Sequence, residues 1–131
     1  MNPILIHSSL IFAFLSLFLY SINEIYPAVN IFILFISSVF HHCHFEGKIG
    51  IFWKYLDLCN IVLSIYVPSC RINYIYTLSI FFILLLFHCN RRMKNSSSFF
   101  NCTEPMESYL HVLIFHVLTS FMYLVTILLT K

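Results

Sequence analysis

Charged residues are scarce in this chain. They make up 9% of its 131 residues, against about 25% in a typical globular domain. Hydrophobic residues make up 60%. A soluble domain of this size could not bury that much apolar surface, because a small domain leaves a large fraction of its surface in water. The composition therefore predicts a protein whose natural solvent is lipid.

Glycine, proline and basic residues are also few. Two glycines and four prolines exclude a low-complexity linker. Fifteen phenylalanines and eight tyrosines exclude a disordered chain, which needs low hydrophobicity and high charge. The net charge is only +2 and no basic stripe is present, so we expect no nucleic-acid partner. Five cysteines, an odd count, do not indicate a full disulfide framework.

Apolar stretches account for most of the chain. They cover residues 4–22, 25–40, 49–67, 72–87 and 109–129. A helix needs about 17–25 residues to cross the hydrocarbon core, and backbone exposed to lipid must satisfy its own hydrogen bonds. We therefore predict an all-α, multi-pass transmembrane helix bundle of about five spans, forming one domain over residues 1–131. Membrane lipid is the expected partner.

The first stretch has a second interpretation, because an N-terminal apolar run can be a signal peptide. No positive residue precedes this run, and no small-x-small cleavage site follows it. Asn23, Glu24 and Pro27 indicate a turn there instead. We therefore expect a true span.

Residues that could perform chemistry lie near the ends of the spans. The second stretch leads into Ser-Ser-Val-Phe-His-His-Cys-His at residues 37–44. On a helix, Ser38 and His42 are four apart and share one face. Neutral imidazole is a favoured zinc ligand, so three histidines in this segment suggest a metal site. The alternative is that they are interfacial and hydrated.

Asp57 is the only acid inside an apolar stretch. An ionisable group at membrane depth costs about 2.5–3.5 kcal/mol on insertion scales, which makes it a functional candidate. The alternative is an ion pair with Lys54, three residues earlier, at the membrane interface. The residues alone favour neither interpretation.

His111 and His116 interrupt the last stretch. They are five residues apart, which places them about 140° apart around a regular helix. A π-bulge would bring them together, and such bulges occur at functional sites. The alternative is one buried histidine and one histidine at the lipid edge.

These features together resemble the CREST superfamily of membrane hydrolases. The shared marks are Ser-x-x-x-His ending one span (Ser38 and His42), an acid early in the next (Asp57) and a histidine-rich last span. The sequence around these marks, at residues 38–43, 55–67 and 115–118, resembles the transmembrane protein 8 family. That family includes a post-GPI-attachment phospholipase and a muscle fusion protein. The similarity covers about half of the chain, roughly residues 31–73 and 108–125.

The resemblance implies zinc-dependent hydrolysis of the acyl ester of a membrane lipid, such as a GPI anchor. His42, His116 and His111 would hold Zn²⁺ and leave one position open for water. Asp57 would take the proton of that water as general base, and Ser38 would hydrogen-bond the water or the oxyanion. A non-catalytic recognition or fusion protein and a truncated family member are the alternatives.

Two departures from the family bear on the metal site. The family has seven spans, whereas the sequence predicts five. The family's last-span pair is His-x-x-x-His, and Val112 occupies the first of those positions here. His111 is one residue out of place, so it fits the ligand set only with a bulge.

Two rules disagree about orientation. Lysine and arginine are more frequent on the side of the long loop, so the positive-inside rule places that loop and the N-terminus in the cytosol. The resemblance implies the reverse orientation. The loop carries glycosylation sequons at Asn95 and Asn101, which can be modified only in the lumen. We predict a luminal loop with an N-glycan at Asn95 or Asn101, in the plasma membrane or an endomembrane.

Overall fold

The computed structural model describes residues 3–71, 109 and 111–131, and its architecture in these ranges is helical. The elements are α1 (Pro3–Ser8), α2 (Leu10–Ser21), α3 (Ile25–His42), α4 (Gly47–Ser69), the π-helix η1 (Val112–Leu118) and α7 (Thr119–Thr130). The all-α fold class is therefore confirmed. The predicted stretch at residues 72–87 and the sequons at Asn95 and Asn101 lie outside the described residues.

Four helical segments of the described part are long and apolar enough to cross a membrane. They are Pro3–Ser21, Ile25–His42, Gly47–Pro68 and Val112–Thr130. Each overlaps a predicted stretch with ends shifted by a few residues. The main differences are that α3 continues through His42 and α4 begins at Gly47. The connection between α3 and α4 is therefore only four residues long, because buried histidines form the last turn of α3.

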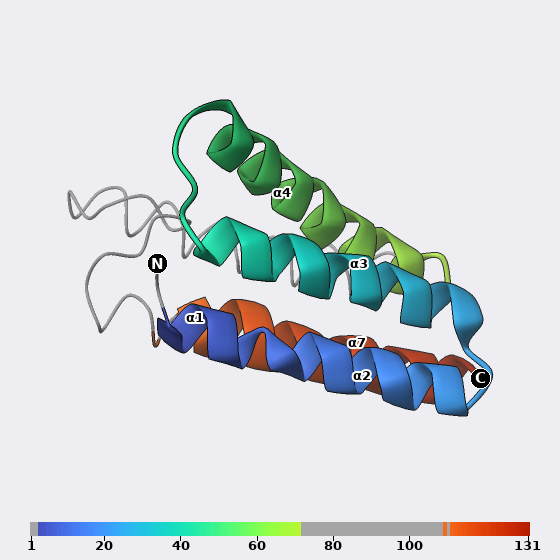
Figure 1. The fold of residues 1–131 in the computed structure, drawn as a ribbon. Helices are drawn as coiled ribbons and strands as arrows, with labels where there is room; N and C mark the ends of the chain where they lie inside the picture. Colours follow the sequence, from blue (N-terminus) through green and yellow to red (C-terminus); the bar gives the residue numbers. More distant parts are fainter. Residues whose placement is uncertain (1–2, 72–108, 110) are drawn as a thin grey trace, which may run out of the picture.

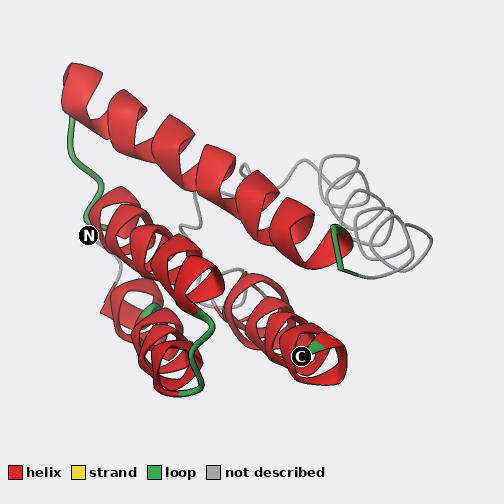
Figure 2. Cartoon of the chain, turned by 90° about the vertical axis from the view of Figure 1, so that its right-hand side faces the viewer, coloured by secondary structure: helices red, strands yellow, loops and turns green. Residues whose placement is uncertain are grey.

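The helices pack as a bundle in which α3 lies between α2 and α4, and α7 lies alongside α2 (Figures 1 and 2). Helices α2, α4 and α7 run in the same direction, and α3 runs antiparallel to them. One end of the bundle holds the start of α1, the end of α3 and the starts of α4 and η1. We call it the histidine end. The opposite end holds the turn from α2 to α3, the end of α4 and the C-terminus. We call it the ion-pair end.

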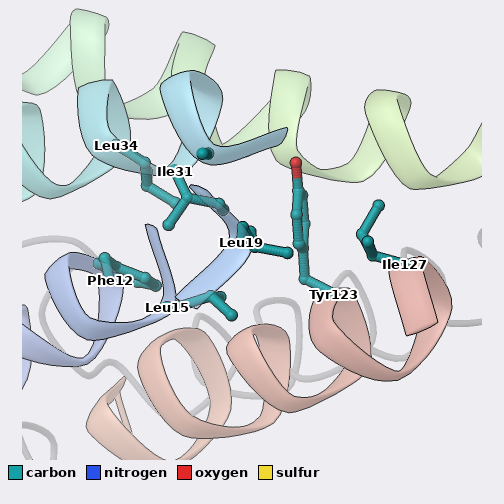
Figure 3. Close-up of a cluster of buried hydrophobic side chains, with 8 residues drawn as sticks. Phe12, Leu15, Leu19, Ile31, Leu34, Tyr123 and Ile127 are labelled. Carbon is teal, nitrogen blue, oxygen red and sulfur yellow. The ribbon is translucent and has the colours of Figure 1, made fainter. Parts of the chain in front are cut away.

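A hydrophobic core lies between the helices (Figure 3). Its buried members are Phe12, Leu15, Leu19, Ala28, Ile31, Leu34, Tyr123 and Ile127. Large apolar side chains also cover the outer surface: Phe14, Leu17 and Leu129 are each about two-thirds or more exposed. An apolar exterior around a small packed core is expected of helices surrounded by lipid.

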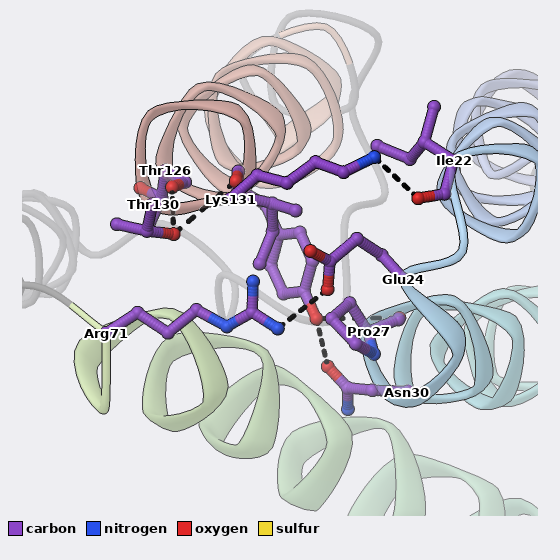
Figure 4. Close-up of polar contacts among 10 residues, drawn as sticks. Ile22, Glu24, Pro27, Asn30, Arg71, Thr126, Thr130 and Lys131 are labelled. Atoms are coloured by element: carbon purple, nitrogen blue, oxygen red, sulfur yellow. Dashed lines mark hydrogen bonds and ion pairs between the residues drawn. The ribbon is translucent and has the colours of Figure 1, made fainter.

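Paired polar groups close the ion-pair end (Figure 4). Arg71 Nη2 lies 2.7 Å from Glu24 Oε2, and this hydrogen bond and charge lower the pKa of Glu24 and raise the pKa of Arg71. Tyr123 donates from its hydroxyl to Asn30 Oδ1 at 3.1 Å. Lys131 Nζ donates to the Ile22 carbonyl at 2.6 Å. These contacts join α2, α3, α4 and α7 toward the ion-pair end of the bundle.

A candidate metal centre

Three histidines meet at the histidine end of the bundle. His42 is the last residue of α3, His111 directly precedes η1, and His116 lies within η1. One ring nitrogen from each lies within 4.8 Å of the other two. All three side chains are buried, with exposed fractions of 0%, 2% and 2%. The cluster therefore offers three nitrogen donors to one point, and it could hold a metal ion.

The π-helix η1 explains how His111 and His116 reach the same point. Five residues on a regular α-helix would place them about 140° apart, but their ring centroids are only 5.1 Å apart. The wider turn of η1 supplies the missing rotation. At its end, Thr119 Oγ1 lies within hydrogen-bond distance of the carbonyl oxygens of Ile114 and Phe115, five and four residues back. Because both histidines are buried, neither of them lies at the lipid edge.

His42 is the residue whose environment points most clearly to a metal. Neither Nδ1 nor Nε2 of its buried ring has a hydrogen-bond partner among the described residues. Leaving a buried polar group without a partner costs about 1–3 kcal/mol. A coordinated cation would satisfy one of these nitrogens, and the donor set of neutral imidazoles suits it. The residues present therefore fit a metal ligand set.

A serine contacts the ring of His116. Ser8 Oγ lies 2.7 Å from His116 Nδ1 and 3.0 Å from the Leu5 carbonyl oxygen. Metal-binding histidines commonly form a hydrogen bond through their other ring nitrogen.

Asp57 is 3% exposed and held by neighbouring polar side chains. Ser37 Oγ lies 3.4 Å from Asp57 Oδ1, and Asn60 Nδ2 donates to Ser37 Oγ at 3.0 Å. Within the described residues, Asp57 forms no ion pair with Lys54. Of the two interpretations left open by the sequence, the interfacial ion pair is therefore absent, and Asp57 belongs to the buried network.

A cavity of about 10 Å³ adjoins the histidine cluster. Its polar lining includes Ser38, Asp57, His111 and His116, and its apolar lining includes Phe12 and Leu34. Such a cavity holds about one water molecule. The structure thus brings the predicted site residues to one place, while their catalytic roles stay predictions.

Ser38 contacts Ser9. The two hydroxyl oxygens lie 2.9 Å apart, and Ser9 Oγ lies 2.8 Å from the Leu5 carbonyl oxygen. Ser38 also lines the small cavity.

The sequence analysis did not identify the supporting residues Ser8, Ser9, Ser37 and Asn60. The sequence held one indication of the supporting serines. Serines interrupt the first apolar stretch, and a second serine precedes Ser38. Serine is common in membrane helices for packing alone, so the signal did not single them out.

The comparisons with known proteins found no matching family model, no matching curated protein and no matching solved structure. The likeness to the transmembrane protein 8 family therefore depends on the motifs quoted above, and family membership stays a prediction.

Proposed function

We propose that this chain is a zinc-dependent hydrolase of membrane-lipid acyl esters, of the transmembrane protein 8 type within the CREST superfamily. The observation that carries the proposal is His42, which is fully buried with two unpartnered ring nitrogens and lies beside His111 and His116. A side chain so costly to bury is best explained by a ligand that it holds.

Zinc is the metal that the donor set favours. The cluster has three imidazoles, and catalytic zinc sites commonly use three protein ligands and keep one position open. Bound there, zinc would supply Lewis acidity toward water and an ester carbonyl. Imidazole also binds other transition metals, so the identity of the ion is part of the proposal.

Asp57 is placed to act as the general base. Its carboxylate lines the same cavity as His111 and His116, and Ser37 Oγ lies 3.4 Å from Asp57 Oδ1. A water in this cavity would give one proton to Asp57, and Ser38 lines the same cavity as a hydrogen-bonding partner for that water. General-base catalysis of this kind contributes about 10²–10⁴-fold in rate.

The apolar surroundings favour a lipid substrate. Phe12, Leu34 and Ile61 line the cavity, and the helices that carry the site are apolar enough to lie in a bilayer. We therefore assign the substrate to acyl esters of membrane lipids, including those of GPI anchors. The protein would lie in the plasma membrane or an endomembrane as a multi-pass protein.

Release of acyl chains in proteoliposomes tests this function. The substrate is a fluorescent diacyl phospholipid, and the variants are Asp57→Asn and Glu24→Gln. Each change neutralises one acid, but Glu24 lies at the ion-pair end. We expect Asp57→Asn to lower the rate by about 10²-fold or more and Glu24→Gln to leave it unchanged. Equal rates in both variants would remove Asp57 from the mechanism. A zinc-loaded protein that releases no acyl chain would instead favour a recognition role.

A further inference from the structure

A second and larger cavity opens at the histidine end. Its volume is about 460 Å³, and it lies between the end of α3 and the first turns of α4. Its lining consists of His41, His44, Phe45, Gly47, Gly50, Ile51 and Lys54. None of these residues lines the small cavity beside Asp57. The two cavities are therefore built from separate sets of side chains.

Lys54 supplies the charge of this cavity. It lies in the second turn of α4 and is half-buried. In the described part of the chain, no acid pairs with its ammonium group and no carbonyl accepts from it. A cation that is partly removed from water and has no partner is costly, so an anionic ligand would stabilise this arrangement.

The rest of the lining also suits an anion. No acidic residue is present in it. The rings of His41 and His44 stack with centroids 6.4 Å apart, and a neutral imidazole offers an N–H donor. The cavity therefore combines one positive charge with two potential hydrogen-bond donors.

The loop wall of the cavity is fixed by a close backbone contact. A Cβ atom at Gly50 would lie 1.8 Å from the Phe45 carbonyl oxygen. The loop between α3 and α4 can therefore pack directly on the first turn of α4 only because residue 50 is glycine.

Aromatic side chains indicate the depth of the cavity in the membrane. Phe40 and Trp53 stack with centroids 4.5 Å apart, and Phe45 stacks against Phe40. The spanning segments end at His42 and begin again at Gly47. Tryptophan is enriched at the membrane–water interface, so the cavity lies at the level of lipid headgroups.

We propose that this cavity binds the phosphate group of a phospholipid, with Lys54 as its counter-ion and His41 and His44 as donors. Free phosphate has the same chemistry, but the depth of the cavity favours the lipid. The assignment does not depend on the metal centre, because the two cavities share no residue.

Native mass spectrometry of the detergent-purified protein tests the proposal. The probes are dioleoyl phosphatidic acid, dioleoylglycerol and inorganic phosphate. The variants are Lys54→Met and the matched control Lys48→Met, since Lys48 lies on the same helix but does not line the cavity. We expect Lys54→Met to weaken phosphatidic acid binding about tenfold, the loss typical of one charge-assisted hydrogen bond. Lys48→Met should bind as the wild type does, and Lys54→Arg should retain binding.

Three further outcomes separate the possibilities. Binding of phosphatidic acid that persists in chelator, with no binding of dioleoylglycerol, supports a phosphate site independent of the metal. Inorganic phosphate that binds as well as the lipid overturns the assignment to a phospholipid. Equal binding by Lys54→Met and Lys48→Met, whether both are weakened or neither is, overturns the site itself.

Discussion

The two ends of the bundle differ in whether their polar side chains have hydrogen-bond partners. At the ion-pair end, Arg71 pairs with Glu24, Tyr123 bonds to Asn30 and Lys131 bonds to a backbone carbonyl. At the histidine end, the nitrogens of His42 have no partner among the described residues, and two cavities are present. Unsatisfied groups and cavities cost stability, and proteins retain them mainly at functional sites. The difference places the paired polar groups at one end and the candidate metal ligands at the other.

The hydrophobic core extends between the two ends. Leu19, Tyr123 and Ile127 belong to it, and Phe12 and Leu34 also line the small cavity beside the histidines. The ring centroid of Phe12 lies 5.1 Å from that of His116. The core therefore packs directly against the candidate site.

Deleting one residue from η1 and one from α7 should produce the largest difference in stability between two variants. Leu113 in η1 and Phe121 in α7 are similarly exposed, at 58% and 60%. Deleting Leu113 should convert the π-turn to α-helix and place the two histidines four apart on one face. Deleting Phe121 should rotate the rest of α7 by about 100° and remove Tyr123 and Ile127 from the core, at a cost of roughly 3–5 kcal/mol.

Unfolding in detergent and zinc content measure this contrast. We expect the Leu113 deletion to stay folded and keep its zinc, and the Phe121 deletion to lose its cooperative unfolding transition. If both deletions were equally damaging, η1 would not be an inserted bulge.

Substitution of one polar residue at each end should change stability in opposite directions. In chelator, His42→Leu should raise the free energy of unfolding by about 1 kcal/mol or more, because it removes two unsatisfied nitrogens. Tyr123→Phe should lower it by about 1 kcal/mol, since the bond to Asn30 is lost. Thermal unfolding followed by circular dichroism gives both values. A metal-free His42→Leu protein less stable than the wild type would show that the imidazole serves packing.

The smallest effect is expected at the ion pair itself. Arg71 is about one-third exposed, so Arg71→Gln should lower the free energy of unfolding by only about 0.2–1 kcal/mol. The pKa of Glu24 is lowered by Arg71. The contribution of the ion pair to the free energy of unfolding is therefore fully present above about pH 4.3, the pKa of Glu24 in the unfolded chain. It is lost as the pH falls through the lower pKa of Glu24 in the folded protein.

Unfolding midpoints of wild type and Arg71→Gln, compared at neutral and acidic pH, check the sign of this contribution. The two proteins should differ at neutral pH and converge in acid. A difference that grows in acid would contradict the assignment of the pair.

Most of the fold could be predicted from the sequence. Apolar length alone placed the segments that became Pro3–Ser21, Gly47–Pro68 and Val112–Thr130. The end of α3 was harder to predict, because His41 and His42 look like loop residues until the cluster that buries them is known. The turn indicated by Asn23, Glu24 and Pro27 ends before Pro27, since α3 begins at Ile25 and Asn23 takes the left-handed conformation, with φ of 63°.

The candidate site could be predicted only in outline. Sequence spacing suggested Ser38, His42 and Asp57, and it named the bulge that His111 would need. It could not show that a bulge forms, because that depends on tertiary packing around the helix. The roles of Ser8 and Ser9 depend on contacts between helices far apart in the chain, which no local pattern reveals.

X-ray absorption at the zinc edge, combined with elemental analysis of the purified protein, tests the central claim most directly. The account predicts one zinc per chain with nitrogen and oxygen ligands only, lost in His42→Ala and kept in His44→Ala. His44 is the matched control because it lies two residues away and outside the cluster. A wild-type protein without zinc, a sulfur ligand from the neighbouring Cys43, or zinc that survives His42→Ala would contradict it.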